Sequence, residues 1–486
     1  MTTSGARGST ARRPHVVVVG GGISGLAAAV ECRARLGDRA TITVLEADAQ
    51  IGGKLRSGET GGVVHDAGAE SLLTRRPEAL ALVADAGLGD TVVHPAATSA
   101  SLWLDGSLRA LPARTIMGIP RDLSALAASG VLSLATLLQL PLDRVKGPTR
   151  FEPGDTVDDI AIGALVSARL GREVVDKLVE PLLGGVYAGH ADDLSFAATL
   201  PELARETQVQ GSLLRAAELV GRRQQGEGPV FATVSGGLGR LPQAVAVASG
   251  ADIRCRTRAT ALTSAATGWR VAVEGEKGPE VLDADAVVIA TQATPAAGLL
   301  RTVAPFAAAD LESLDYASVA LVAYALPREA LRRPLLGTGF LVPPAEDRVI
   351  KAATFASRKW DWVAEQSDEL EVIRVSVGRH RETHHLERDD DDLAWAAWGE
   401  LASAVDIDGS PVAWSVTRWD DALPQYSVGH LDRVARVQAQ VGEHPGLALC
   451  GAALEGVGIA ACVASAQAAA QRATEPLADA RGTMTS

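Results

Sequence analysis

The two ends of the chain share one pattern of hydrophobic and polar positions. Near the N-terminus, His15 and four valines predict a buried parallel strand, a glycine-rich turn follows, and small residues at 26–36 predict a helix. A second strand is predicted at 41–46, which gives half of a βαβ unit. Residues 447–473 repeat the order of strand, glycine-rich turn and helix. We therefore expect an α/β fold whose parallel sheet draws on both ends of the chain.

The middle of the chain changes pattern twice. Helical patterns dominate 75–225, whereas strand patterns cluster at 252–262, 269–274 and 286–290, and again within 316–419. These changes predict an α/β domain, a helical insertion and a second domain with a mixed or antiparallel sheet. We expect tails at 1–13 and 476–486, the α/β domain at 14–85, 226–300 and 428–475, the helical insertion at 86–225, and the second domain at 301–427.

An uncharged stretch of 20 residues, 123–142, is long enough to cross a bilayer as a helix. It also contains Ser, Thr, Gln and Gly and a late Pro, which favour a buried or membrane-touching helix over a spanning one. The N-terminal residues lack the pattern of a signal peptide. We expect a cytoplasmic protein, and the sequence leaves peripheral membrane contact and the oligomeric state open.

Composition narrows the function classes. The 46 basic and 59 acidic residues give a net charge of −13, which argues against a protein that binds nucleic acid through its phosphates. Four cysteines without a Cys-x-x-Cys pair argue against a disulfide scaffold or a zinc ribbon. The histidine cluster at 380–385 lacks the order of a zinc-binding helix, so no metal site is expected.

The glycine-rich turn at 20–25, GGGISG, fits the pattern G-x-G-x-x-G. Gly20 permits a tight turn, Gly22 lets a diphosphate approach the backbone, and Gly25 lets the helix pack closely on the strand. Glu46 ends the second strand 21 residues after Gly25, where an acid accepts the hydroxyls of an adenosine ribose. The strand, turn, helix and acid together predict a dinucleotide-binding site.

A second glycine pair begins six residues after Glu46. Gly52 and Gly53 offer further backbone donors to the same diphosphate, and Arg56 offers a cation. A nicotinamide dehydrogenase has no need of this second cradle, whereas a flavoenzyme that holds extended FAD does. The spacing therefore favours FAD, the alternative being that Lys54 and Arg56 are surface charges.

The glycine-rich turn at 450–458 leads into an alanine-rich helix. Free N–H groups at the start of such a helix stabilise negative charge, as on the N1/C2=O edge of a reduced flavin. Val457, Gly458 and Ile459 are therefore candidate flavin contacts.

Several further motifs are more specific: VEPLLGGVYAG at 179–189, Arg418-Trp419 with LPQY at 423–426, and EGVGI at 455–459. With the nucleotide motif, they make the chain resemble the protoporphyrinogen/coproporphyrinogen III oxidase family of amine-oxidase-like flavoproteins. The resemblance covers the chain from His15 to about Gln471. Many relatives have Val at the position of Ala259 and GPDS at 68–71, where this chain has GAES.

The resemblance implies a Rossmann-like FAD domain of the glutathione-reductase type, a helical insertion, a substrate domain and one non-covalent FAD per chain. Gly185, Tyr187 and Gly189 would line the substrate pocket. No catalytic acid or base is expected, because the flavin accepts a hydride and the protein supplies position and a dry pocket. The implied cofactor-binding residues are Gly20, Gly21, Gly22, Ile23, Ser24, Gly25, Glu46, Ala47, Gly53, Lys54, Arg56, Gly68, Ala69, Glu70, Ser71, Ala259, Trp419, Val457, Gly458 and Ile459.

The implied reaction is the oxidation of coproporphyrinogen III to coproporphyrin III in haem biosynthesis, with dioxygen as final acceptor and hydrogen peroxide as product. Oxidation of protoporphyrinogen IX is the first alternative. The two substrates differ in carboxylate number, and discrimination between them is a property of the assembled cavity. A flavin amine oxidase or carotenoid desaturase is the second. A non-catalytic, GDI-like carrier on the same fold is the third. The sequence does not identify which Arg or Lys binds the substrate propionates.

Overall fold

The computed structural model describes residues 12–147, 159–224 and 228–479. At its centre is a five-stranded, all-parallel sheet in the order β12-β2-β1-β16-β22. Its strands are β1 (His15–Val19), β2 (Thr41–Leu45), β12 (Asp252–Arg254), β16 (Ala286–Ile289) and β22 (Leu447–Leu449). Segments far apart in the sequence thus build one sheet, and the predicted α/β fold class is confirmed.

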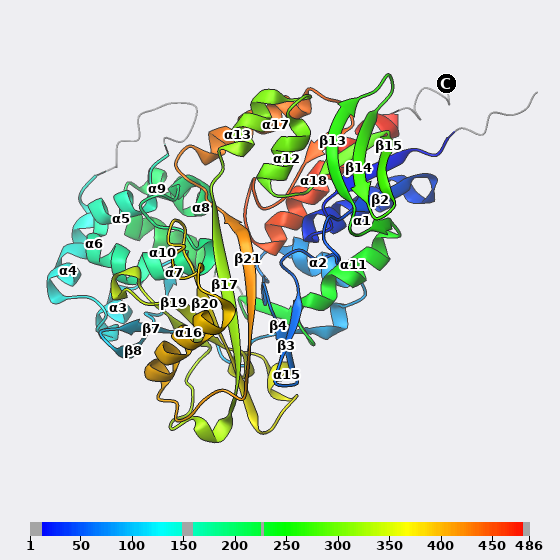
Figure 1. The fold of residues 1–486 in the computed structure, drawn as a ribbon. Coiled ribbons are helices and arrows are strands. Elements are labelled where there is room, and N and C mark those ends of the chain that lie inside the picture. The colour runs from blue at the N-terminus through cyan, green and yellow to red at the C-terminus, as the bar shows by residue number, and fades with distance from the viewer. Residues whose placement is uncertain (1–11, 148–158, 225–227, 480–486) are drawn as a thin grey trace, which may run out of the picture.

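Both faces of this sheet are covered, which explains the unbroken valine run in β1. Val16 and Val18 lie in the core on one face, whereas Val17 and Val19 lie in the core on the other. The first face is covered by α1 (Ile23–Leu36), α2 (Pro77–Asp85), α11 (Leu241–Ser249) and α18 (Ile459–Asp479). The second is covered by the antiparallel strands β13 (Arg258–Ser264), β14 (Trp269–Gly275) and β15 (Gly278–Ala284), with α12 (Ala293–Leu300), α13 (Pro305–Glu312) and α17 (His430–Gly442) (Figure 1).

A second sheet has seven strands in the order β21-β17-β20-β19-β18-β7-β8. The β18–β7 pair is parallel and the other pairs are antiparallel. Helix α16 (Asp390–Val405) packs on it, and Tyr324 in β17 donates a hydrogen bond of 2.5 Å to the carbonyl oxygen of Ala394 in that helix. The strands are β21 (Ala413–Pro424), β17 (Tyr316–Pro327), β20 (Leu370–Val377), β19 (Ile350–Phe355), β18 (Gly339–Leu341), β7 (Ser101–Leu104) and β8 (Ser107–Ala110).

Residues 86–120 differ from the mostly helical pattern that we expected there. They form the hairpin β7–β8, whose two-residue turn at Asp105 and Gly106 has positive φ angles of 50° and 74°. Paired positive φ angles match the twist of a tight hairpin, and Asp-Gly is a preferred sequence for them. The short strands β6 (Val92–Val93), β9 (Thr115–Ile116) and β10 (Ile119–Pro120) lie in the same part of the chain.

The remainder of the insertion is helical, but 123–142 is not one helix. Helix α3 (Leu123–Ser129) ends at Gly130, whose φ of 65° is left-handed, and α4 (Leu134–Gln139) follows as a separate short helix. Among the helices of the described residues, none combines the length and apolar character needed to cross a membrane. The other helices here are α5 (Ile162–Leu170), α6 (Arg172–Val174), the π-helical turn Val175–Val179, α7 (Glu180–Tyr187), α8 (Phe196–Thr199), α9 (Pro201–Gln210) and α10 (Leu213–Arg223).

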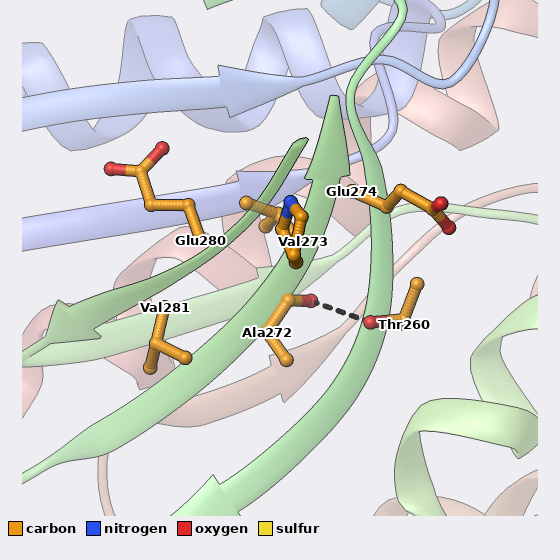
Figure 2. A pocket seen from close by; sticks show the side chains of 7 residues that line it. Thr260, Ala272, Val273, Glu274, Glu280 and Val281 are labelled. Carbon is orange, nitrogen blue, oxygen red and sulfur yellow. Dashed lines mark hydrogen bonds between the residues drawn. The ribbon is translucent and has the colours of Figure 1, made fainter. Parts of the chain in front are cut away.

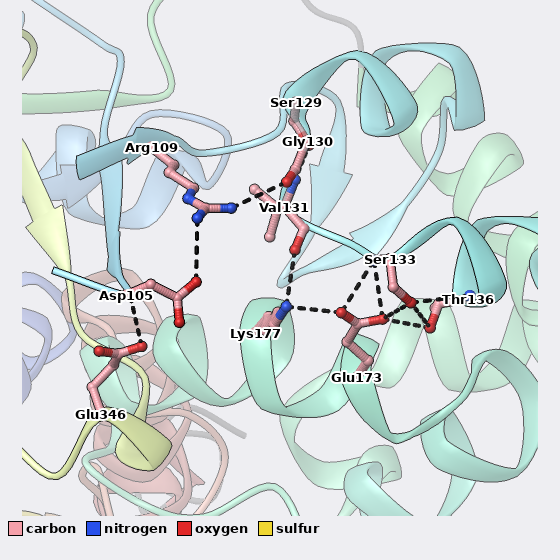
Figure 3. A network of polar contacts seen from close by, with 10 residues as sticks. All are labelled: Asp105, Arg109, Ser129, Gly130, Val131, Ser133, Thr136, Glu173, Lys177 and Glu346. Carbon is pink, nitrogen blue, oxygen red and sulfur yellow. Dashed lines mark hydrogen bonds and ion pairs between the residues drawn. The ribbon is translucent and has the colours of Figure 1, made fainter. Parts of the chain in front are cut away.

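A polar network fixes the start of α4. Glu173 accepts hydrogen bonds from the backbone N–H and hydroxyl of Ser133, from Thr136 and from Lys177, at 2.5 to 3.1 Å (Figure 3). These donors lower the pKa of Glu173 to about 2, against the opposing effect of burial. Elsewhere in the described residues lie two small sheets, β3 (Ser57–Thr60) with β4 (Val63–Asp66) and β5 (Leu72–Leu73) with β11 (Phe231–Val234) and β6, and the short helices α14 (Ala356–Lys359) and α15 (Asp361–Ala364).

Candidate functional site

The glycine loop between β1 and α1 is tight on one side and open on the other. Gly20 has a φ of 111° and donates its N–H to the carbonyl oxygen of Leu45 at 2.8 Å. A Cβ on Gly25 would lie 1.8 Å from the carbonyl oxygen of Gly20, so only glycine allows the helix this close to the strand. A Cβ on Gly22 would meet nothing within 4 Å. The loop is therefore open at the residue predicted to face the diphosphate.

The second glycine pair lies directly against this loop. Gly52 donates its N–H to the carbonyl oxygen of Gly21 at 2.9 Å, and a Cβ on Gly53 would lie 3.5 Å from the Cα of Gly22. Lys54 follows, and no described residue accepts a hydrogen bond from its ammonium group. Burial lowers the pKa of Lys54, and the Cys462 thiol in the first turn of α18 acts on that pKa in the opposite sense. The structure therefore brings two of the predicted cofactor-binding segments and the start of α18 together around a cation to which the described residues offer no hydrogen-bond acceptor.

Glu46 is held at the carboxyl end of β2. Its Oε2 accepts the N–H of Gly21 and its Oε1 accepts the N–H of Asp48, both at 2.8 Å. The carboxylate is partly exposed beside the glycine loop, and Ala47 next to it is exposed. The Glu46 carbonyl oxygen accepts the N–H of Thr257 at 2.8 Å, which places the start of β13 and Ala259 close by. The acid is thus oriented where a ribose on a loop-bound dinucleotide would lie.

Trp419 in β21 joins the second sheet to the loops of the first. Its Nε1 donates to the carbonyl oxygen of Ala67 at 2.9 Å, and a Cβ on Gly68 would lie 3.1 Å from its ring. Arg56 stacks over the same ring at 5.4 Å and pairs with Asp48 at 3.1 Å. The predicted contacts Arg56, Gly68 and Trp419 therefore form one cluster, although they lie in segments far apart in the sequence.

Glu70 has a different environment from the one its place in the predicted cofactor turn suggests. Its carboxylate accepts from Lys359 Nζ at 2.5 Å and from Arg374 Nη1 at 2.7 Å, and Arg374 Nη2 also donates to the carbonyl oxygen of Gly68. The side chain thus ties the turn to α14 and β20, so a cofactor contact from this residue would come from its backbone. Its neighbours in the turn differ in exposure, Ala69 being exposed and Ser71 partly buried.

The turn before α18 is shaped by a residue to which sequence reasoning gave no role, Tyr426. The Tyr426 hydroxyl accepts the N–H of Gly456 at 2.7 Å and donates to the carbonyl oxygen of Ala452 at 2.5 Å. Val457 is partly buried, Gly458 is exposed, and α18 begins at Ile459. The N–H groups of the first turn of this 21-residue helix therefore lie beside an exposed glycine.

Helix α7 carries the predicted substrate-pocket residues. Gly185 is exposed, and Tyr187 is buried and packs on Tyr426 with ring centroids 5.7 Å apart. Gln425 donates from Nε2 to the carbonyl oxygen of Tyr187 at 2.8 Å, and a Cβ on Gly189 would lie 2.2 Å from its Oε1. Tyr426 therefore connects the end of α7 to the turn before α18. Sequence matching places Gln425 and Tyr426 in a motif, but only the fold shows what they contact.

One surface depression lies away from these residues. An open depression of about 420 Å³ on β13–β15 is lined by seven residues, none of them a predicted site residue (Figure 2). Within the described ranges, no group of three or more His, Cys, Asp or Glu side chains has an arrangement that would hold a metal.

The open Gly22, the unpartnered Lys54, the anchored Glu46 and the exposed turn before α18 fit an extended dinucleotide. A family model described as flavin containing amine oxidoreductase matches residues 23–474, and the chain belongs to this family. Within it, the chain is 35% identical over 450 residues to a coproporphyrinogen III oxidase of Mycobacterium leprae, covering 92% of this chain and 96% of that protein. It is 31% identical over 470 residues to a coproporphyrinogen III oxidase of Bacillus subtilis, covering 94% and 97%.

Solved structures agree with this assignment. A crystal structure from Exiguobacterium sp. 255-15, of a protein provisionally named protoporphyrinogen oxidase, superposes with a TM-score of 0.81 at 30% identity, covering 96% of this chain and 99% of that one. Putrescine oxidase shares the fold at a TM-score of 0.69 and 15% identity. The family resemblance drawn from the sequence motifs is confirmed.

Proposed function

We propose that this protein is an FAD-dependent oxidase that converts coproporphyrinogen III to coproporphyrin III in haem biosynthesis. The relatives named above support the substrate, and the flavin family supports the cofactor. The observation that carries the proposal is the contact chain from Tyr187 through Tyr426 to Gly456, which joins the family-specific motif of α7 to the turn before α18. A pocket wall and a flavin loop must meet in this way if a hydride is to pass between two bound molecules.

The chain's own residues would hold one FAD without a covalent bond. The N–H groups of the glycine loop and of Gly53, with Lys54, would bind the diphosphate. Glu46 would accept the ribose hydroxyls, and the first turn of α18 would face the flavin ring. When bound, FAD would supply the hydride acceptor, and dioxygen would reoxidise it with release of hydrogen peroxide.

In this proposal neither Tyr187 nor Tyr426 acts as a base. Burial raises the pKa of Tyr187 to about 12, so its phenol stays protonated at ordinary pH. Burial also raises the pKa of Tyr426, whose hydroxyl is committed to two backbone groups. These residues would position substrate and cofactor and exclude water. Proton loss from the substrate would then go to solvent.

The test is a porphyrin fluorescence assay on the purified protein with each porphyrinogen, beside its flavin absorbance spectrum and a peroxide assay. Rapid fluorescence and peroxide with coproporphyrinogen III, and little with protoporphyrinogen IX, are the expected results. A yellow protein that oxidises neither substrate would contradict the proposal.

Protoporphyrinogen IX is the second candidate substrate. A chloroplastic protoporphyrinogen oxidase of Arabidopsis thaliana is 27% identical to this chain over 494 residues, covering 94% of it. Coproporphyrinogen III is preferred because the bacterial relatives named for it match at higher identity. The same assay separates the two, since the reverse substrate preference would select protoporphyrinogen IX.

A further inference from the structure

Lys351 is a buried lysine in an irregular part of β19. The pairing register of β19 with β20 shifts between Ile350 and Ala352, so Lys351 lies at a bulge and has no opposite residue in β20. Only 6% of Lys351 is exposed. Among the described residues, none accepts a hydrogen bond from its ammonium group or pairs with it. Among the charged groups of the described residues, the one that acts on the pKa of Lys351 is another cation, Arg379.

Arg379 lies next to Lys351 and is equally buried, at 6% exposure. Val342 connects the two: its N–H donates to the carbonyl oxygen of Lys351 at 2.9 Å, and its own carbonyl oxygen accepts from Arg379 Nη2 at 2.8 Å. The nearest carboxylate is Glu382, 3.7 Å from Arg379 Nη1 and shared with His190 at 3.2 Å. The Nε of Arg379 is buried and has no hydrogen-bond partner in the described structure.

These cations border the helix that carries the substrate motif. Helix α7 packs on β18 and β19, and Figure 1 labels it beside β19. A Cβ on Gly184 would lie 3.9 Å from Arg379 Nε, and one on Gly185 would lie 3.5 Å from the side chain of Leu341 in β18. Gly184 and Gly185 have no side chains, so this part of α7 brings no polar group to Arg379 Nε. Glu180, the first residue of α7, acts on Arg379 but not on Lys351.

Within this group, Lys351 is the cation without a counter-charge among the described residues. Burying an ammonium group next to a guanidinium costs free energy unless an anion compensates it. Burial first, and Arg379 second, lower the pKa of Lys351 to about 7, which shows how poorly the protein alone supports its charge. A carboxylate between Lys351 and Arg379 would form charge-assisted hydrogen bonds with both and satisfy the free Nε.

We propose that Lys351 and Arg379 form a carboxylate-binding subsite at helix α7 that takes one propionate group of the porphyrinogen. This assignment rests on the proposed function for its substrate, but the site itself is defined by two buried cations: Lys351, which pairs with no carboxylate among the described residues, and Arg379, whose Nε has no hydrogen-bond partner there. It names the cationic partners that the sequence left unidentified. Lys351 is a binding residue in this scheme and takes no part in hydride transfer.

The test compares Lys351→Met with wild type, because methionine keeps the length and apolar stem of lysine and removes the charge. We expect KM for coproporphyrinogen III to rise about tenfold with kcat within about twofold, since binding is lost without a change in chemistry. The matched control is Lys277→Met, in the exposed turn between β14 and β15, which should leave both constants unchanged. The melting temperature should stay level or rise, because an uncompensated charge leaves the core.

A binding assay with the product, coproporphyrin III, distinguishes failure of the subsite from failure of the proposed function. Wild type should bind coproporphyrin III more tightly than its tetramethyl ester, and Lys351→Met should lose affinity for the acid but not for the ester. Equal affinity of the two proteins for the acid would overturn the subsite, as would a fall in melting temperature with loss of flavin. If wild type oxidises no porphyrinogen but shows this carboxylate dependence, the subsite stands and the proposed function falls.

The pH dependence of binding gives an independent readout. Wild-type affinity for coproporphyrin III should fall as pH rises above about 7, where Lys351 loses its proton. Glu382 and Glu180 act on Arg379, and His190 bonds to Glu382 with a pKa raised by that carboxylate, so these groups also titrate nearby. Lys351→Met retains all of them, and the component of the pH dependence that it removes belongs to Lys351. A profile unchanged by the substitution would refute the assignment.

Discussion

Replacing Glu70 with glutamine should destabilise the contact between the turn at 68–71 and the second sheet, where Arg374 lies in β20. Glu70 is the only carboxylate that pairs with Lys359 or Arg374 in the described structure, at 2.5 and 2.7 Å. The exposed fractions of the three side chains are 14%, 15% and 8%, so this is a buried network. Glutamine keeps the shape of glutamate but leaves two buried cations without a counter-charge.

The burial decides the size of the effect. An exposed ion pair contributes about 0–1 kcal/mol, whereas removal of one partner from a buried pair costs about 3–5 kcal/mol. With about 2.1 cal/mol/K of unfolding entropy per residue, the 486-residue chain has an unfolding entropy of about 1 kcal/mol/K. Glu70→Gln should therefore lower the melting temperature by about 3–5 °C if the chain melts as one unit.

The assay is thermal melting of wild type and Glu70→Gln across pH, with Glu365→Gln as the exposed control. Burial alone would raise the pKa of Glu70, but Lys359 and Arg374 hold it below its ordinary value. A carboxylate with a lowered pKa stabilises the fold above its unfolded pKa, and that contribution is lost as pH falls through the folded pKa. The gap between the two proteins should be constant near neutrality and should shrink below pH about 4.5. A gap under about 1 kcal/mol at neutral pH would refute the assignment of a buried network.

Three further predictions follow from single contacts. Gly25→Ala places a Cβ 1.8 Å from a backbone oxygen and should abolish flavin binding, read as absorbance near 450 nm. The control Gly298→Ala has open space around the added Cβ and should retain full flavin. Tyr426→Phe removes two hydrogen bonds at the turn before α18 and should cost about 1–3 kcal/mol and weaken FAD retention; unchanged retention after dialysis would count against its role. Burial raises the pKa of Asp66 to about 6, so at a pH between its ordinary pKa and 6 the folded protein keeps a proton on Asp66 that the unfolded chain has released. The free energy of unfolding of Asp66→Asn should therefore rise relative to that of wild type by up to about 3 kcal/mol as the pH increases from about 4 to about 7. Parallel stability profiles of the two proteins would contradict this.

The parts of the fold that the sequence predicted are those that depend on neighbours in the chain. Four valines in a row have no polar face, so they require a strand covered on both sides, and both sides of β1 are indeed covered. Gly25 and Glu46 act within one βαβ unit, where spacing along the chain fixes position in space. Local pattern therefore sufficed to predict the glycine loop and the place of Glu46 beside it.

The parts that the sequence missed depend on distant partners. Strand β7 pairs with β18, more than 200 residues later, and no periodicity within 86–120 reports that partner. The Asp105-Gly106 turn was the local signal for the hairpin and was outweighed by the helical pattern around it. The ion pairs of Glu70 and the isolation of Lys351 likewise arise only when the second sheet is assembled.

The strand β21 and the residues that follow it connect the second sheet, helix α7 and the turns at Gly68 and Gly456. Trp419 contacts the turn at Gly68, and Tyr426, seven residues later, contacts both α7 and the turn at Gly456. β21 is also an edge strand of the second sheet, paired along its length with β17 (Figure 1). Hydride transfer requires donor and acceptor atoms in van der Waals contact, and errors of about 1 Å are costly. Under the proposed function, β21 would help to meet this requirement, because Trp419 in the strand contacts the turn at Gly68 and Tyr426, two residues after its end, contacts the turn at Gly456.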